Sequence, residues 1–241
     1  MRRTVRRFGP LILLLLALAG LALLLFVRWY FGGDSGSNTL IARFLRQPET
    51  RAALMNAGYS ACPGAPFILP SEGLIGLLYA DTARPYTVTR QHTGLDIFGD
   101  GASGTVPIVA AYPGWLTRLE DWRSTVAIRH EDPLEAGRSI WTYYTHMASR
   151  DGATSFIAAD FPAGTRERFV AQGTLLGTQG EFAGNAPPIA MHLHFSIVLA
   201  DAEGIFLNEA VLSNTLDPSP YLGMAVAMDA NPERPIPCLT N

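Results

Sequence analysis

The stretch Met191-His192-Leu193-His194-Phe195 is the part of this chain that says most about its fold and its chemistry. Two histidines at alternate positions of an apolar run predict a β-strand, because successive side chains of a strand point to opposite faces. His192 and His194 then share one face, while Leu193 and Phe195 pack on the other. Paired imidazoles indicate a functional site, although His-x-His also occurs by chance and in satisfied cores.

Two other segments favour a metal site. His92-Thr93-Gly94-Leu95-Asp96 places an imidazole and a carboxylate four residues apart, and Tyr144-Thr145-His146 ends another β-rich run. Thr93 and Gly94 are poor helix residues, so we expect a turn that leads into a strand, with Gly94 letting the backbone bend until both side chains converge. Four of the five histidines of the chain fall in these three segments.

The amino terminus predicts a membrane anchor. Residues 1–8 form a basic, cytoplasmic segment, and residues 9–31 are almost purely apolar and reach the usual spanning length of about 20 residues. A cleaved signal peptide is the alternative, but Phe26–Phe31 lacks a small-x-small cleavage pattern, and Trp29 and Tyr30 are typical of interfacial anchors. We therefore expect a single-pass protein of the cell membrane with its main domain outside the cytoplasm.

The net charge of the exported part argues against some classes of binding partner. Five of the 18 basic residues lie at or before the span, which leaves 13 basic against 21 acidic groups, a net charge of −8, outside the membrane. That balance argues against nucleic acid binding. A net negative charge would not hold the domain on anionic wall polymers either, so we expect the membrane anchor to determine where the protein is located.

Both cysteines, Cys62 and Cys238, lie outside the membrane in this topology, where a disulfide can persist. A bridge would tie together the two ends of the region that carries the motifs. Two unrelated thiols are the alternative. Neither cysteine accompanies the histidines, so a cysteine-rich zinc site is not expected.

The remaining chain divides by composition. Residues 32–69 form a flexible tether and a helical lead-in (Thr39–Arg46 and Pro48–Asn56, with Leu40, Phe44 and Leu45 as an apolar face), residues 70–222 form the main domain, and residues 223–241 form a C-terminal tail. Short β runs separated by Gly, Pro, Asp and Ser predict a mostly β, antiparallel sheet domain. The expected strands are Tyr86–Thr89, Pro107–Tyr112, Trp115–Leu119, Thr125–His130, Ser139–His146, Phe169–Ala171 and His192–Leu199.

The chemistry of the motifs favours zinc. Hydrolytic zinc sites take three ligands from histidine and carboxylate and leave one position for water, and His92, Asp96 and His194 make such a set. His146 and His192 then remain as a catalytic pair that can move protons beside the metal. A serine hydrolase is not expected, because the chain has no Gly-x-Ser-x-Gly elbow.

The order His-x-x-x-Asp, Tyr-x-His and His-Leu-His-Phe resembles the lysostaphin/LytM-type zinc metallopeptidases, which cut peptidoglycan cross-links. The resemblance spans roughly Pro70 to Leu222 and includes Pro107–Ala111, Val126–His130 and the glycines before the last motif. It implies a β-sheet groove, one Zn²⁺ on His92, Asp96 and His194, and His146 and His192 as catalytic histidines.

The chain departs from the family pattern at three places: the approach Asn185–Met191, Ser196 where glutamate is common, and a long Ala148–Gln172 segment. These departures concern the walls of the groove and hence the substrate. Two further residues are candidates for a supporting or substrate-contacting role, His130 and Tyr144, the latter on the face of His146.

We therefore expect a membrane-anchored zinc endopeptidase that acts on peptidoglycan peptides. One alternative is a non-catalytic, LytM-like module that activates a cell-wall amidase. Such modules characteristically lose zinc ligands or catalytic histidines, whereas this chain keeps all five positions. Another alternative is an endopeptidase that acts on a protein.

Overall fold

The computed structural model describes residues 5–31, 36–184, 187, 189–230 and 232–240; Arg2 and Arg3 of the basic segment, tether residues 32–35 and parts of the approach to His192 (185–186 and 188) lie outside it. The helices are α1 (Val5–Phe31), α2 (Ser37–Arg46) and α3 (Ser219–Leu222), with short 3-10 helices η1 (Pro48–Ala53), η2 (Leu212–Asn214) and η3 (Met228–Ala230). The strands are β1 (Leu74–Leu77), β2 (Leu95–Phe98), β3 (Pro107–Val109), β4 (Gly114–Thr117), β5 (Val126–Glu131), β6 (Ser139–Thr145), β7 (Arg168–Val170), β8 (Leu175–Thr178), β9 (Leu193–Leu199) and β10 (Thr215–Leu216).

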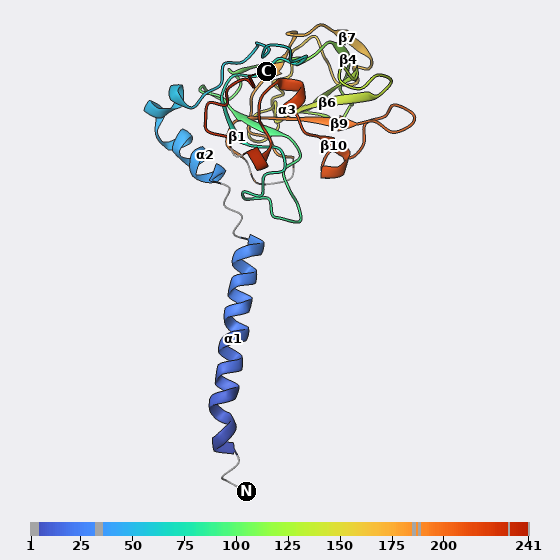
Figure 1. Cartoon of the computed structure of the whole chain (residues 1–241). Coiled ribbons are helices and arrows are strands. Elements are labelled where there is room, and N and C mark those ends of the chain that lie inside the picture. Colours follow the sequence, from blue (N-terminus) through green and yellow to red (C-terminus); the bar gives the residue numbers. More distant parts are fainter. Residues whose placement is uncertain (1–4, 32–35, 185–186, 188, 231, 241) are drawn as a thin grey trace.

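Helix α1 is long and apolar enough to cross a membrane. Its window Pro10–Val27 has a mean hydropathy of 2.9 and is not buried against the rest of the chain. Figure 1 shows α1 projecting away from the folded part. A signal sequence near the amino terminus meets the same criteria of length and hydropathy, so α1 establishes a candidate span and no topology.

An eight-stranded antiparallel sheet in the order β1-β2-β9-β6-β5-β4-β7, with β10 also on β9, forms the framework of the domain. Strands β3 and β8 pair in a second, two-stranded sheet. The prediction of a mostly antiparallel β domain is confirmed. Strand β9 lies between β2 and β6, so the His-Leu-His-Phe stretch enters the middle of the sheet.

The two faces of the sheet differ in character. On one face Leu193 and Phe195 of β9 belong to the main hydrophobic core, together with Ile108 of β3 and Leu176 of β8. His194 lies on the other face, as the alternation of the strand requires. The small second sheet therefore covers the apolar face and leaves the histidine face for the site.

The helical lead-in packs beside β1 and β2. Phe44 of α2 is buried with Leu54, Leu74 and Phe98, which is a separate small core. Leu45, which we expected on the apolar face, is 41% exposed. The sequence spacing predicted Phe44 and Leu45 on one apolar face of the helix, but of the two only Phe44 packs against β1 and β2.

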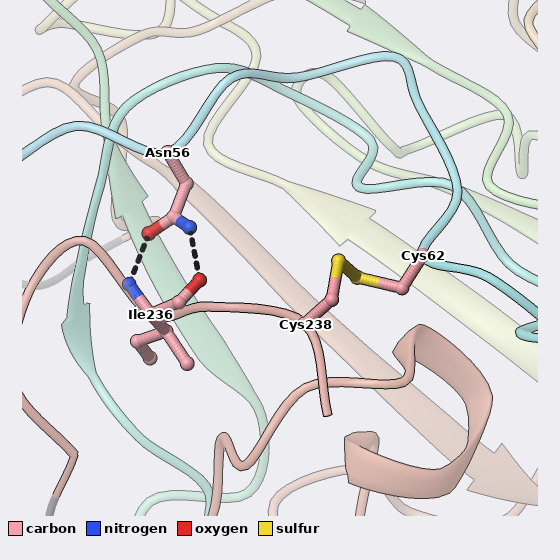
Figure 2. Close-up of a disulfide and its surroundings, with 4 residues drawn as sticks. All are labelled: Asn56, Cys62, Ile236 and Cys238. Atoms are coloured by element: carbon pink, nitrogen blue, oxygen red, sulfur yellow. Dashed lines mark hydrogen bonds between the residues drawn. A yellow bond between two sulfur atoms is a disulfide. The ribbon is translucent and has the colours of Figure 1, made fainter. Parts of the chain in front are cut away.

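The C-terminal residues pack into the domain, whereas a tail was expected from residue 223. Met224, Val226 and Ile236 belong to the main core. Figure 2 shows that Asn56 Nδ2 donates to Ile236 O (2.7 Å) while Ile236 N donates to Asn56 Oδ1 (3.1 Å), beside a disulfide between Cys62 and Cys238. The segment adds apolar side chains that the core needs, which composition alone did not reveal.

Strand positions differ from the sequence prediction in two respects. Tyr86–Thr89 is a turn region, in which Thr87 and Arg90 bond each other's backbone, because its β-forming residues find no neighbouring strand to pair with. Strands β1, β8 and β10 were not among the predicted strands. β1 is buried at all four positions, β8 buries only Leu176 and Gly177, and β10 has two residues, so none of them shows the polar–apolar alternation that marks a half-exposed strand.

Candidate metal centre and active site

His92 enters the site from a loop that is tied to the end of β1. Its backbone N donates to Asp81 O, and Ala80 N donates to its carbonyl. The side chain is fully buried, and Nδ1 lies 2.9 Å from Leu78 O. A carbonyl oxygen only accepts, so Nδ1 carries the proton and Nε2 presents its lone pair to the interior of the site.

Asp96 and His194 reach the site from paired strands. They lie opposite each other on β2 and β9, and both side chains are 8% exposed. Gly94 allows this approach: a Cβ there would lie 2.2 Å from Phe195 O. We expected Gly94 to relax the backbone, but its φ lies outside the left-handed region, so the structural need is space for the strand beside it.

The three predicted ligands form a compact triangle of donor atoms. His92 Nε2 lies 3.1 Å from Asp96 Oδ1 and 3.0 Å from His194 Nδ1, and the last two atoms are 2.9 Å apart. Tetrahedral coordination with bonds of ~2.0–2.1 Å separates two ligand atoms by roughly 3.3 Å. The triangle therefore fits an ion of the size of Zn²⁺ after a shift of a few tenths of an ångström, and its two nitrogens and one oxygen suit that metal.

His146 and His192 lie beside this triangle and against each other. Their ring centroids are 4.6 Å apart, and His192 Nε2 is 3.5 Å from Asp96 Oδ1. His146 follows the last residue of β6 with a φ of 76°, a conformation that non-glycine residues seldom adopt and that often marks functional sites. The four histidines of the three motifs thus meet in one place.

Backbone carbonyls orient this second pair. His146 Nδ1 lies 2.7 Å from Phe182 O, and His192 Nδ1 lies 2.7 Å from Ala190 O. Both imidazoles therefore carry their proton on Nδ1 and keep Nε2 as a base. The two carbonyls come from the same loop between β8 and β9.

The electrostatics of the site keep the second pair neutral. Burial lowers the pKa of His146 to about 3, with the neighbouring imidazoles adding to the effect, and burial also lowers the pKa of His192. Burial opposes the charge of Asp96, but His92, His192 and two hydrogen bonds hold its pKa well below the usual range. At neutral pH the site therefore offers one carboxylate and two unprotonated bases.

His194 has a different environment. Burial disfavours its charged form, but Glu209 and Asp96 outweigh burial and raise its pKa to about 10. Glu209 Oε1 lies 2.8 Å from His194 Nε2. Because a metal ligand must give up its proton, binding of a metal at Nδ1 would release a proton from this residue.

A cleft of about 660 Å³ opens onto the site. His146 and His194 line it, whereas His192 does not and lies deeper, stacked on Phe98. The floor includes Tyr143 and Thr145, and loops carrying Tyr86, Trp122 and Phe182 form its walls. A chain segment lying in this cleft would therefore meet His146 before it met His192.

Two of the candidate residues lie away from the triangle. Tyr144 is fully buried, packs on Phe195 and accepts a hydrogen bond from Ala111 N, so Tyr143, and not Tyr144, shares the cleft with His146. His130 is also fully buried, with Nδ1 donating to Pro113 O (2.8 Å) and Nε2 accepting from the Thr142 hydroxyl (2.7 Å). Both side chains belong to the packing on the core side of the sheet.

Two side chains at the site escaped the sequence analysis. Glu209 comes from the loop after β9, where no spacing marks it, and Tyr86 lies in a segment predicted to be a strand. The Tyr86 ring lies 4.8 Å from that of His92, and burial, followed by the charges of Asp96 and Glu209, raises the pKa of its phenol. A turn signal at Pro85 was the one local hint that Tyr86 belongs to a loop.

Among solved structures similar to this chain is the catalytic domain of the prophage-encoded M23 protein EnpA from Enterococcus faecalis (24% identity, TM-score 0.35, 64% of this chain and 96% of that one). Others are a putative M23 peptidase from Pseudomonas aeruginosa (20%, 0.37, 70% and 55%) and lysostaphin (18%, 0.33, 70% and 49%). The chain thus spans about half the length of these two proteins. No family model and no curated protein matches the sequence.

Proposed function

We propose that this protein is a zinc-dependent endopeptidase, anchored in the cell membrane, that hydrolyses peptide bonds in peptidoglycan outside the cytoplasm. The observation that carries the proposal is the orientation of four imidazoles around one carboxylate. Each has one nitrogen held by an acceptor: Leu78 O for His92, Phe182 O for His146, Ala190 O for His192 and Glu209 for His194. Each therefore turns its other nitrogen to the site.

His92, Asp96 and His194 would hold the metal through Nε2, Oδ1 and Nδ1. When bound, zinc supplies a Lewis acid for the scissile carbonyl and lowers the pKa of a water molecule towards about 7. The neutral Nε2 of His146, at the cleft, can take a proton from the attacking water and return it to the leaving amine. His192 Nε2, beside Asp96, can accept or share a proton deeper in the site, and the Tyr86 phenol stays protonated as a hydrogen-bond donor.

The substrate class rests on the motif resemblance and on the open cleft, which suits an extended peptide. A regulatory module on the same fold would not need three metal ligands and two neutral bases, so their joint retention favours the enzyme. The apolar α1 and the arginines before it support anchoring with the cleft outside the cytoplasm.

The test combines elemental analysis with digestion of purified peptidoglycan, for the wild-type protein and for His194→Ala. About one zinc per chain and release of muropeptides, both lost in the variant, would support the proposal. Zinc binding without muropeptide release, but with cleavage of a protein substrate, would redirect it to a protein target. Absence of zinc from the wild-type protein after zinc is supplied would refute it.

A further inference from the structure

Glu209 reaches the candidate metal centre from a part of the chain that carries none of the motifs. It lies between β9 and η2, and its side chain is 19% exposed. Its Oε1 accepts two hydrogen bonds, from His194 Nε2 at 2.8 Å and from the Thr93 hydroxyl at 2.6 Å. Thr93 is buried and directly follows the ligand His92.

This contact decides which nitrogen of His194 faces the other ligands. A carboxylate only accepts, so Nε2 donates its proton to Glu209, and Nδ1 is the nitrogen that faces Asp96 Oδ1 and His92 Nε2. Nδ1 would present its lone pair to a metal once binding releases its proton. A carboxylate on the far nitrogen of a metal-binding histidine also makes the near nitrogen a stronger donor. Glu209 therefore has a defined geometric task that a surface carboxylate does not have.

The same oxygen joins both histidine ligands. Thr93 brings the backbone next to His92 into contact with Glu209, while His194 contacts it directly, and the two ligands lie on segments 102 residues apart. Of the other acidic residues, Asp121 also lines the cleft, but its side chain is exposed and forms no ion pair or hydrogen bond within the part of the chain that the structure describes. It provides a matched control.

We propose that Glu209, held by Thr93, is a positioning residue that fixes His194 with Nδ1 towards the metal. The inference rests on the metal site of the proposed function, and on no statement about substrate. It predicts that metal affinity depends on the Glu209 carboxylate, in the loop after β9, as well as on the residues that bind the metal directly.

The experiment measures zinc affinity by competition with a fluorescent chelator, using the full chain in detergent. Glu209→Ala should weaken binding about 10- to 100-fold, as loss of such partners typically does. Glu209→Gln, which keeps an acceptor without its charge, should lose about threefold to tenfold, because a charge-assisted hydrogen bond is roughly twice as strong as a neutral one. Thr93→Val should weaken binding and Asp121→Asn should not.

A second readout keeps the inference testable if Glu209→Ala does not fold. Long-range ¹⁵N–¹H correlation of the zinc-loaded wild-type protein should show a protonated Nε2 and an unprotonated Nδ1 for His194, with the Nε2 resonance shifted in Glu209→Gln. Zinc affinity of Glu209→Gln and Thr93→Val within twofold of wild type, or a proton on Nδ1 of His194, would overturn it. If zinc affinity falls as expected in the Glu209 and Thr93 variants while the wild-type protein cuts no peptidoglycan, Glu209 keeps this role and only the proposed substrate is refuted.

Discussion

Asp96 and His194 lie directly opposite each other on β2 and β9, and Asp96 Oδ1 lies 2.9 Å from His194 Nδ1. Antiparallel pairing brings the Cβ atoms of opposite residues to about 5 Å, within reach of two short side chains. Strand register therefore brings two of the three candidate ligands opposite each other. His92, on a loop, needs the separate hydrogen bonds to Asp81 and Leu78.

The catalytic pair should be separable from metal binding. His146→Ala and His192→Ala remove the neutral bases while the triangle of His92, Asp96 and His194 stays intact. We expect about one zinc per chain in both variants and hydrolysis reduced by at least ~10²-fold, the usual contribution of a positioned acid or base. Muropeptide release at the wild-type rate in either variant would remove that residue from the mechanism.

Gly94→Ala should damage both the sheet and the metal site. The new Cβ would meet Phe195 O at 2.2 Å, so β9 must move and carry His194 with it. We expect a loss of about 1–3 kcal/mol in the free energy of unfolding and weaker zinc binding, measured by thermal unfolding and chelator competition. Gly137→Ala, where φ is positive but nothing lies within 4 Å, should cost backbone strain and leave zinc affinity unchanged.

Loss of the disulfide should destabilise the domain. Cys62 and Cys238 are separated by 176 residues, so their bridge closes most of the folded part. Cys62→Ser and Cys238→Ser should each lower the free energy of unfolding by about 2–5 kcal/mol. The double variant should match the single ones, and a much larger loss would mean that one thiol has a role besides the bridge.

His130 should make stability depend on pH. Burial lowers its pKa to about 4, below the value of about 6.5 for an unfolded histidine, while Arg129 adds to the shift and Asp132 opposes it. The unfolded chain therefore binds the extra proton between these values, and stability present above pH 6.5 is lost as the pH falls towards 4. The difference in unfolding free energy between wild type and His130→Gln should shrink by up to about 3 kcal/mol over this window.

If α1 is a membrane anchor, residues 1–31 should remain in the mature protein. An uncleaved α1 should keep the protein in the membrane fraction after washing with salt and carbonate, and Edman sequencing should begin at the start of the chain. Replacing residues 1–31 with a cleavable signal sequence should release the domain in soluble form. A mature amino terminus after Phe31 in the natural protein would show that α1 is a signal sequence.

The sequence by itself determined which side chains can bind a metal or accept a proton, and on which face of their strand the two histidines of the His-x-His motif lie. Alternation in a strand put His192 and His194 opposite Leu193 and Phe195, and short β runs with turn residues specified an antiparallel sheet, since both follow from local backbone geometry. The same local logic missed short buried strands such as β1 and assigned a strand to the loop that carries Tyr86. Propensity describes a segment, whereas pairing needs a partner elsewhere in the chain.

Only the tertiary structure decided how the donors are oriented. Glu209 and the carbonyls of Phe182 and Ala190 are acceptors that any residue or loop can offer, so no motif marks them, and their effect depends on distances between segments far apart in sequence. The same holds for the packing of Met224, Val226 and Ile236 into the core and for the close approach at Gly94. Residue types fix which atoms can bind a metal or a proton; the fold fixes which lone pair of each faces the site.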